Sequence, residues 1–395
     1  MITVAGGVYI EKCLYPNDTE NTFGSGGRAA QALRQTGLKV DLHLFAPDTA
    51  QRSVEGSFLG TGIILRRTSS EQLYEFVYRH ALAQPCVSPW PPEDPKHAIV
   101  SAPLVLRYGA IEGDFKVQAD VAIYDPQSPD KPAHFRANGS TAKQLAIILN
   151  RQELIAFGGV DELDAVRTLI KADQADVVVV KNGAYGANVY NAGGLLTRVP
   201  PLETIRISKI GTGDIFSAAF AYWWGHKKES PVDAAMKASK CVAAFCESQV
   251  LNFNVAINYP FHAAPDPKPE KTIYLAGPFF STGQFLLVDE AAHLIQKLGG
   301  KVFSPYHHVG KGSPSYVVPK DLEGLDNAAT VLAIVDGNDA GTLFEVGYAR
   351  AHDIPVVALA ESPKGHDLTM LIGTDCEIVE DLCTAVYRAI WSSWR

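Results

Sequence analysis

The sequence predicts an α/β protein with two successive parallel sheets, the first larger than the second. Short runs rich in β-branched residues alternate with helix-like segments along the chain, as in parallel strands joined by crossover helices. A proline-rich stretch over residues 259–270 has no helical or strand period and interrupts this alternation as a stiff linker would. A chain of 395 residues is expected to form two or three domains. We therefore predict one domain over residues 1–258 and another over residues 271–395.

Composition is that of an ordinary globular protein, with 47% hydrophobic and 20% charged residues. The formal net charge is −8 and no cluster of Lys and Arg stands out, so no nucleic-acid polymer is expected as a partner, although small anionic ligands fit. The six cysteines form no CxxC pair, and we expect a reducing, cytoplasmic environment. We find no signal segment and no apolar run that could span a bilayer, so no membrane partner is expected.

The first domain opens with a strand and a glycine turn over residues 1–11. A glycine-rich segment then leads into an Ala/Leu helix that stops at Gly37. A glycine turn before a helix is a weak indication of a ligand, and a tight turn is its simplest interpretation. The acidic residues Glu112 and Asp114 are expected on the solvated surface. The later strands of this domain are expected over residues 40–46, 117–125, 145–149 and 176–180.

A second glycine turn is a stronger indication of a ligand site than the first. Gly211, Thr212, Gly213 and Asp214 open an Ala/Phe-rich helix. Backbone N–H groups at such a helix start can hold an anion. An Asp beside them can accept the proton of a hydroxyl group that attacks a phosphate. The turn therefore predicts phosphate chemistry in the first domain.

This turn and the Asn150–Glu153 pair resemble the ribokinase (PfkB) family of sugar and nucleoside kinases, over roughly residues 1–258. The resemblance implies a ribokinase-like three-layer α/β/α fold, with ATP and Mg²⁺ as cofactors. It implies that Asp214 is the catalytic base and that Glu11 and Gly24 bind the substrate. Glu153 would hold Mg²⁺ indirectly. The residues that the resemblance assigns to ATP and phosphate are Asn150, Glu153, Asn182, Gly183, Gly186, Gly211, Thr212 and Gly213.

Three features depart from that family. Ser208 and Lys209 stand where the family has Asp-Thr, and Arg28 replaces its usual Asn. The segment from Lys12 to Phe23 is short for the β-strand lid that covers the substrate, which predicts a wetter and less preorganised site. Arg28 could instead contact a phosphorylated ligand. The departures leave two interpretations open, an active kinase and a nucleotide-binding regulatory domain.

The second domain continues the alternation of strands and helices, and its ligands are expected at the carboxyl ends of the strands. Ser281, Thr282 and Gln284 could bind a sugar or a 5′-phosphate, or cap the following helix. The first strand is expected to end at the Gly277-Pro278 turn. Further strands are expected over residues 301–304, 330–335 and 355–360, and helices over residues 285–298, 317–328 and 381–394.

Glu345 follows the apolar run 330–335 and the small residues Gly341 and Thr342, which open a helix. It is therefore expected near the first turn, where the partial positive charge of the helix favours an ionised carboxylate. Such a carboxylate at the mouth of a parallel sheet is suited to be a nucleophile. The alternative is a Glu that only complements the helix dipole.

Three motifs, YLAGPFF, KDLEGL and DGNDAGTLFEVGYARA, occur in this order over residues 271–395. They resemble the nucleoside 2-deoxyribosyltransferase family, which includes nucleoside 5′-monophosphate N-glycosidases. The resemblance implies a flavodoxin- or Rossmann-like parallel-sheet domain that needs no cofactor. It implies that Glu345 is the nucleophile, that Asp321 is the second acid and that Tyr274 positions the nucleophile. The residues that it assigns to the substrate are Gly277, Phe279 and Asp339. Breaking an N-glycosidic bond builds an oxocarbenium-like carbon, which one carboxylate can trap while another serves the leaving group.

The sequence thus predicts a bifunctional enzyme of nucleoside or nucleotide metabolism. Its second domain would cleave or transfer at the N-glycosidic bond, and its first domain would phosphorylate a nucleoside or sugar from ATP. The alternative is that the first domain is a nucleotide sensor that regulates a nucleotide-depleting glycosidase. The expected partners are small nucleosides, nucleotides or sugars, and both resemblances imply a homo-oligomer. The Gly277 turn carries no Arg, which favours nucleosides over monophosphates, whereas the acceptor, water or a base, stays open.

Overall fold

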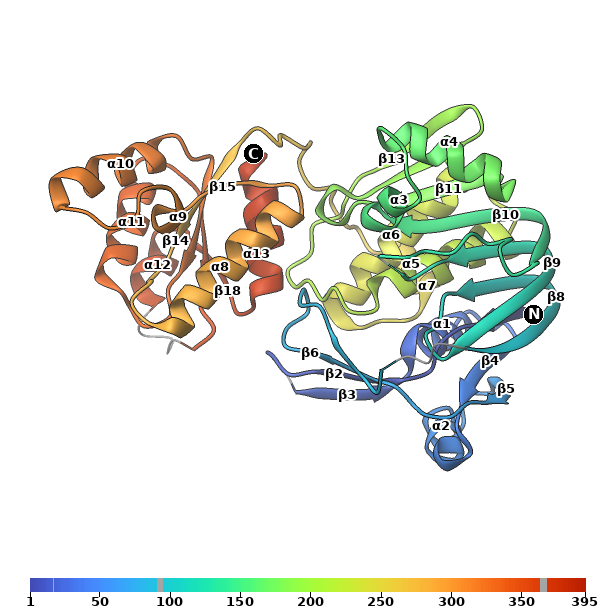
Figure 1. The fold of residues 1–395 in the computed structure, drawn as a ribbon. Coiled ribbons are helices and arrows are strands. Elements are labelled where there is room, and N and C mark those ends of the chain that lie inside the picture. The colour runs from blue at the N-terminus through green and yellow to red at the C-terminus, as the bar shows by residue number, and fades with distance from the viewer. Residues whose placement is uncertain (17, 91–94, 129, 363–367) are drawn as a thin grey trace. The chain divides into compact units, whose positions relative to one another are not determined.

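The structure is a computed structural model that describes residues 1–395 except 17, 91–94, 129 and 363–367. The chain divides into two compact units (Figure 1). Unit 1 consists of residues 1–204 and 208–263, and unit 2 consists of residues 205–207 and 264–395. This division falls inside the proline-rich stretch, and the predicted domain limits at residues 258 and 271 stay a prediction.

Unit 1 is built on a nine-stranded sheet with the order β13-β12-β11-β10-β9-β8-β1-β4-β5. Neighbours from β11 to β5 run parallel, whereas β12 and β13 form an antiparallel edge. The strands are Ile2–Ala5 (β1), Val40–Ala46 (β4), Ile64–Ser69 (β5), Lys96–Tyr108 (β8), Gly113–Asp125 (β9), Thr141–Asn150 (β10), Val177–Lys181 (β11), Ala187–Asn191 (β12) and Gly194–Val199 (β13). The strands predicted for the first domain all form, and the sequence had not indicated β5, β8 or the antiparallel edge.

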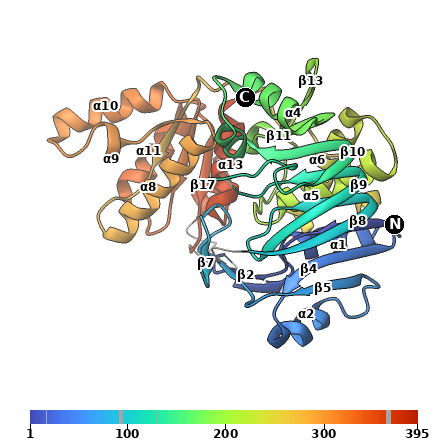
Figure 2. The same ribbon diagram turned by 45° about the vertical axis from the view of Figure 1, so that its right-hand side comes forward.

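Helices cover both faces of this sheet (Figure 2). Val177 and Val179 of β11 belong to one hydrophobic core, and Val178 and Val180 belong to the other, because successive strand side chains point to opposite faces. The first core packs against α1, α5 and α6, and the second against α3 and α4. The helices are Gly24–Arg34 (α1), Gln51–Ser57 (α2), Arg151–Ala156 (α3), Glu162–Asp173 (α4), Thr212–Phe220 (α5), Pro231–Ser248 (α6) and Phe253–Asn258 (α7). The predicted three-layer α/β/α architecture is confirmed.

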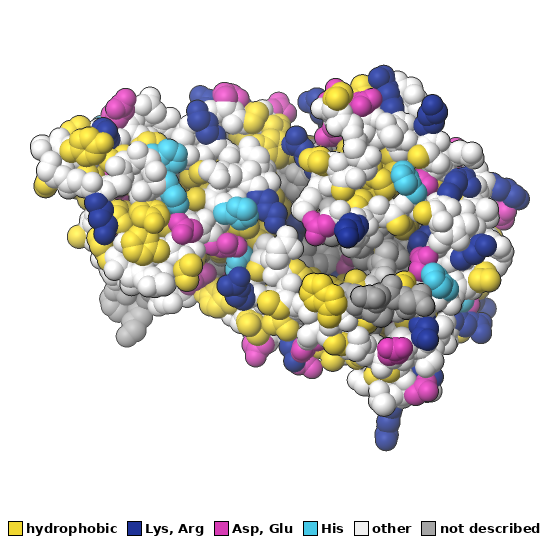
Figure 3. Space-filling view, in the orientation of Figure 1, with side chains coloured by type: hydrophobic (Ala, Val, Ile, Leu, Met, Phe, Trp, Pro, Cys, Tyr) yellow, Lys and Arg dark blue, Asp and Glu magenta, His cyan; other side chains and the backbone are white. Residues whose placement is uncertain are grey.

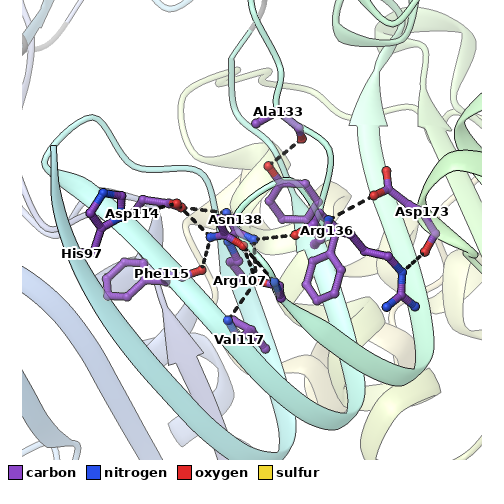
Figure 4. A network of polar contacts seen from close by, with 12 residues as sticks. His97, Arg107, Asp114, Phe115, Val117, Ala133, Arg136, Asn138 and Asp173 are labelled. Carbon is purple, nitrogen blue, oxygen red and sulfur yellow. Dashed lines mark hydrogen bonds and ion pairs between the residues drawn. The ribbon is translucent and has the colours of Figure 1, made fainter. Parts of the chain in front are cut away.

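A polar network ties β8 and β9 to the turn before β10 (Figure 4). Arg107 on β8 donates to Asp114 Oδ1 on β9 at 2.8 Å and to Ser140 Oγ at 3.2 Å. Asn138 donates to Asp114 Oδ2 at 2.8 Å, and the Arg107 guanidinium lies 4.7 Å from the ring centre of Tyr124. Asp114 is therefore half-buried and paired, not simply solvated as the sequence suggested. Because Arg107 and Asp114 neutralise each other, we interpret the network as structural.

A small four-stranded sheet, in the order β3-β2-β6-β7, accompanies the large one in unit 1. Its strands are Ile10–Cys13 (β2), Thr19–Thr22 (β3), Glu75–Tyr78 (β6) and Cys86–Ser88 (β7). The segment after Lys12 is short, as the sequence indicated, but half of this sheet comes from residues 75–88. Strand β2 pairs in parallel with β6, so the short segment after Lys12 is completed by a distant part of the chain.

Unit 2 contains a five-stranded, wholly parallel sheet with the order β15-β14-β16-β17-β18. Its strands are Thr272–Ala276 (β14), Lys301–Phe303 (β15), Thr330–Ile334 (β16), Val356–Leu359 (β17) and Glu377–Val379 (β18). Its helices are Thr282–Lys297 (α8), Pro305–His308 (α9), Pro314–Asp326 (α10), Ala340–Ala351 (α11), Thr369–Gly373 (α12) and Leu382–Ser393 (α13). The order is that of flavodoxin-like folds, which confirms the predicted fold class. Connections leave β14 toward opposite sides, so a ligand crevice is expected at the carboxyl ends of β14 and β16.

The helices do not resemble membrane spans. Across the residues that the structure describes, none combines the length and apolar character needed to cross a bilayer.

Candidate active sites

Tyr274 and Glu345 meet beside the expected crevice of unit 2. Tyr274 is fully buried in β14, and its hydroxyl donates to Glu345 Oε1 at 2.6 Å. Burial and the neighbouring Glu345 carboxylate raise the pKa of Tyr274, so its hydroxyl stays protonated and acts as a donor. The short hydrogen bond fixes the direction of the carboxylate, as a nucleophile requires.

The environment of Glu345 differs from the expectation. Burial raises the pKa of Glu345, the Tyr274 hydrogen bond opposes this shift, and Asp321 and Asp339 add to it, so that the pKa is about 7. Helix α11 begins at Ala340, so Glu345 lies in the second turn and not in the first. The prediction that the helix dipole keeps this carboxylate ionised is therefore wrong, because loss of solvation outweighs a dipole effect that fades after one turn. Near neutral pH, both protonation states of Glu345 are populated.

Asp321 of α10 completes a group of acids with Glu345. Its Oδ1 is buried and has no hydrogen-bond partner within the described part of the chain. Burial raises its pKa, and its charge raises the pKa of both Glu345 and Tyr274, which places it close to them. A buried carboxyl oxygen without a partner is costly unless a ligand or water hydrogen-bonds to it.

The residues assigned to the substrate have mixed roles. Asp339 is the N-cap of α11, where its Oδ2 accepts from the Thr342 backbone N–H at 2.7 Å and from the Thr342 hydroxyl at 2.9 Å. Gly277 follows β14, and a Cβ there would lie 3.2 Å from Ile334, so little space is left for a side chain. Phe279 packs with Tyr306 at 5.6 Å between ring centres.

The polar residues Ser281, Thr282 and Gln284 were open to two interpretations, ligand binding and helix capping. Ser281 Oγ accepts from the Gln284 N–H, and the Gln284 side chain accepts from the Ser281 N–H, which forms a capping box at the start of α8. This contact supports the helix-cap interpretation. Phe280, next to Phe279, is exposed, and Figure 3 shows hydrophobic side chains in patches on the visible face of unit 2.

Replacing Tyr274 with Phe is expected to move the acid limb of the pH–rate profile of unit 2 to higher pH by about one unit. The Tyr274 hydrogen bond lowers the pKa of Glu345, so its loss raises that pKa above about 7. Since the nucleophile acts as the carboxylate, the rate then rises only at higher pH. Tyr348→Phe, which removes a surface hydrogen bond to Asp326, is the control and should leave the profile unchanged. An unshifted profile for Tyr274→Phe would remove the assigned positioning role.

In unit 1, Arg28 joins two of the predicted functional acids. Its Nη1 donates to Asp214 Oδ2 at 2.5 Å, and its Nη2 pairs with Glu11. All three side chains are buried. The second carboxylate oxygen of Asp214 accepts from Gln127 Nε2 at 2.6 Å. Both oxygens of the predicted base are therefore engaged by protein donors.

Two opposing effects act on the pKa values of the acids in this cluster. Burial raises the pKa of Asp214 and of Glu11, and the Arg28 guanidinium opposes both shifts. Arg28 also lies against Gly211, where a Cβ would overlap its guanidinium. The residue that replaces the family's Asn thus occupies the space between the predicted base and the predicted anion turn.

The remaining residues assigned to ATP or to the kinase substrate in this part of unit 1 lie at helix starts. Asn150 and Glu153 form a reciprocal capping box at the start of α3, with Asn150 Oδ1 accepting at 2.9 Å and Glu153 Oε2 accepting at 2.8 Å. Burial raises the pKa of Glu153 to about 7. Gly211, with φ at 77°, precedes Thr212, where α5 begins, so Gly213 and Asp214 lie in its first turn. Gly24, on α1, has φ at 57°, and a Cβ there would lie 2.5 Å from the Gly7 carbonyl oxygen.

The turn after β11 contains Asn182, Gly183 and Gly186. The Asn182 N–H donates to the Gly186 carbonyl oxygen at 2.7 Å and closes this turn.

Gly186→Ala is expected to destabilise unit 1 by roughly 2 to 4 kcal/mol. Its φ is 80°, and a Cβ would overlap the Val199 carbonyl oxygen. Gly37→Ala is the matched control, because φ there is 86° with no atom within 4 Å of the added Cβ. Denaturant unfolding of both variants should show the larger loss for Gly186→Ala, and equal losses would contradict the clash.

The contacts of two charged side chains in unit 1 were not indicated by the sequence. Glu112 is 3% exposed, so its assignment to the solvated surface is wrong. Burial raises its pKa to about 7, and its carboxylate lies against Gly7, whose added Cβ would be 2.9 Å from Oε1. The second group is Lys181, whose Nζ lies 2.7 Å from Asp125 Oδ2. A lysine that ends an otherwise apolar strand was the available signal for this ion pair.

The two units define a two-domain α/β protein with a candidate site at the strand ends of each sheet. Residues 116–255 match the model of the pfkB family carbohydrate kinases, and residues 273–380 match that of nucleoside 2-deoxyribosyltransferase. The chain therefore contains a PfkB-type domain followed by a nucleoside 2-deoxyribosyltransferase-type domain. The combination recognised in the sequence is confirmed.

Several solved structures are similar to 65% of the chain. Ribokinase from Thermotoga maritima is 15% identical, with 99% of that chain covered and a TM-score of 0.48. Ribokinase from Arabidopsis thaliana, complexed with ribose and ATP, is 14% identical, with 98% covered and a TM-score of 0.47. A pyrophosphate-dependent kinase of the ribokinase family, complexed with a pyrophosphate analog and myo-inositol, is 15% identical, with 100% covered and a TM-score of 0.45. No match was found among curated proteins.

Proposed function

We propose that unit 2 cleaves the N-glycosidic bond of a nucleoside and passes the glycosyl group to water or to another base. The observation that carries this proposal is the 2.6 Å hydrogen bond from Tyr274 to Glu345 with Asp321 close by. A fixed carboxylate and a second acid with a raised pKa are the two groups that glycosyl transfer needs. The Gly277 turn without an Arg favours nucleosides over monophosphates.

In the proposed reaction, Glu345 attacks the anomeric carbon as the carboxylate. The carbon–nitrogen bond breaks, its electron pair goes to the base, and Asp321 donates a proton to that base. Water or an acceptor base then attacks the anomeric carbon, Asp321 takes back a proton, and Glu345 leaves as a carboxylate. Tyr274 holds Glu345 throughout, and Gly277, Phe279 and Asp339 contact the nucleoside. These side chains and the acceptor account for every proton and electron pair, so the steps use no cofactor.

We propose that unit 1 binds ATP and phosphorylates a nucleoside or a sugar. The Gly211–Gly213 turn, the Asn182–Gly186 turn and the Asn150–Glu153 pair would hold the nucleotide, and Glu11 and Gly24 the acceptor. Bound ATP supplies the phosphoryl group, and Mg²⁺ offsets its charge. Mg²⁺ usually keeps several waters and phosphate oxygens as ligands, so Glu153 would hold it only indirectly. Asp214 would accept the proton of the attacking hydroxyl.

The Arg28 ion pair favours a second candidate function for unit 1. Both oxygens of Asp214 accept hydrogen bonds, from Arg28 and Gln127, and the Arg28 ion pair makes this carboxylate a weaker base. A domain that keeps its base paired would bind a nucleotide and transfer nothing. It would then act as a nucleotide sensor that regulates the glycosidase. In either case we propose a cytoplasmic homo-oligomer that acts on small molecules.

One assay separates these functions. Purified protein is incubated with ribo- and deoxyribonucleosides and their monophosphates, with and without ATP and Mg²⁺, and free base is followed by chromatography. Labelled phosphate from ATP is followed in the same samples. Base release supports the function of unit 2, and labelled product supports a kinase. Base release that ATP changes without any phosphate transfer supports the sensor. Absence of base release from every substrate, even with an acceptor base present, would rule out the function proposed for unit 2.

A further inference from the structure

Glu112 is a buried acid whose hydrogen-bonding capacity is unmatched. It is 3% exposed, and within the part of the chain that the structure describes neither carboxylate oxygen has a hydrogen-bond partner of normal geometry. Burying a carboxyl group in this way costs free energy, whereas an apolar side chain of the same size would fill the space without that cost. Packing alone therefore does not explain an acid at this position.

The carboxyl group of Glu112 touches the connection between β1 and β2, which consists of residues 6–9. A Cβ added to Gly7 would lie 2.9 Å from Oε1 and 3.0 Å from Oε2 of Glu112. Burial raises the pKa of Glu112, and backbone N–H groups, including those of Val8 and Ile111, lower it. These N–H groups therefore face the carboxyl group, which links the β1–β2 connection to the β8–β9 connection, residues 109–112.

The β1–β2 connection also supports the first turn of α1. The Gly7 carbonyl oxygen accepts from the Gly26 N–H at 3.0 Å, and a Cβ added to Gly24 would lie 2.5 Å from that oxygen. A Cβ added to Gly26 would lie 2.8 Å from the Gly6 carbonyl oxygen, so the helix and the connection are in close contact. Glu11 follows the connection on β2. A shift of the connection would therefore displace both Gly24 and Glu11, the residues assigned to the kinase substrate.

We propose that Glu112 is a positioning residue for the acceptor of unit 1: its carboxyl group holds the β1–β2 connection, which keeps Gly24 and Glu11 in the geometry that binds the acceptor. This inference rests on the kinase function proposed for unit 1. The segments assigned to ATP begin at the ends of β10 and β11 or at the start of α5, so Glu112 acts on the acceptor and not on the nucleotide. The competing explanation is that Glu112 only fills space in the core.

The test measures phosphate transfer from ATP by the full-length protein, with ribose, deoxyribose and adenosine as acceptor probes. Acceptor KM, ATP KM and kcat are determined for the wild type, Glu112→Met and Glu112→Gln. Glu112→Met removes the carboxyl group at similar size and is expected to raise the acceptor KM about 5- to 50-fold, with the ATP KM within about twofold of the wild type. Thermal unfolding of Glu112→Met should match or exceed that of the wild type, because no unmatched carboxyl group remains. Glu112→Gln keeps an oxygen that can accept from the N–H groups and should retain most of the acceptor affinity.

Asp173→Asn is the matched control. Asp173 is another fully buried acid of unit 1, but its Oδ2 is paired, 2.8 Å from His134 Nδ1. The change is expected to lower thermal stability and to leave the acceptor KM unchanged.

A wild-type acceptor KM in Glu112→Met would overturn the inference and leave the kinase function standing. Loss of folding in Glu112→Met, or an equal rise of both KM values, would show a role in the fold and would also overturn it. Wild-type protein that transfers phosphate to none of the probes would contradict the kinase function, and the inference with it.

Discussion

Changing Glu345 to Gln is expected to reduce base release by unit 2 about 10³-fold or more, because the amide cannot attack the anomeric carbon. The change keeps the size of the side chain, and its amide oxygen can still accept from the Tyr274 hydroxyl. Folding should therefore survive, and nucleoside binding should change little. The loss should appear in kcat and not in KM, since the removed interaction forms only as the carbon is attacked.

The measurement is chromatographic release of free base, with the fold checked by thermal unfolding. Glu323→Gln is the control, because Glu323 is an exposed carboxylate on the same helix as Asp321 and has no role in the proposed steps. Glu323→Gln should match the wild type. Wild-type rates for Glu345→Gln would show that this carboxylate is not the nucleophile.

Changing Asp214 to Asn is expected to lower phosphoryl transfer by unit 1 about 10²- to 10⁴-fold, the usual contribution of a general base. The amide cannot take the hydroxyl proton, and Arg28 keeps Glu11 as its remaining partner. ATP affinity should change little, because in the proposed reaction Asp214 contacts the acceptor hydroxyl and not the nucleotide.

Transfer of labelled phosphate from ATP to a panel of nucleosides and sugars measures this effect. Asp120→Asn is the control. Asp120 forms a surface ion pair with Lys143 at 2.7 Å and takes no part in the proposed chemistry. Undiminished transfer by Asp214→Asn would contradict the assigned base. A wild type that binds ATP and transfers no phosphate would favour the sensor, as the Arg28 ion pair suggests.

The parts of the fold that follow local rules were predictable. The buried run 330–335 and the small residues after it predicted a strand and a helix, and both form as β16 and α11. The motifs around Tyr274, Asp321 and Glu345 lie in three separate segments and predicted one shared site. The structure brings these three residues together. Motif order carried this information because Tyr274 lies on β14, whereas Asp321 and Glu345 lie on α10 and α11, helices that follow strands of the same parallel sheet.

Features that depend on distant contacts were not predictable. The small four-stranded sheet needs β2 to pair with β6, and nothing near Lys12 indicates that partner. The raised pKa of Glu345 results from burial, which tertiary packing decides and a helix position does not. Glu112 was expected on the surface because it belongs to a short acidic run, yet its carboxylate packs against Gly7 and is buried. Arg28 was noted as a departure, but only the fold shows that it reaches both Glu11 and Asp214.

The most direct test of the central claim is the mass of the protein during turnover. Wild-type protein is mixed with a nucleoside substrate, quenched in acid within the first turnovers, and examined as intact protein and as peptides. We predict a mass increase of one glycosyl group on the peptide that contains Glu345, its decay when acceptor base is added, and its absence from Glu345→Gln. Base release with no glycosyl adduct at any time, and unchanged in Glu345→Gln, would contradict the account.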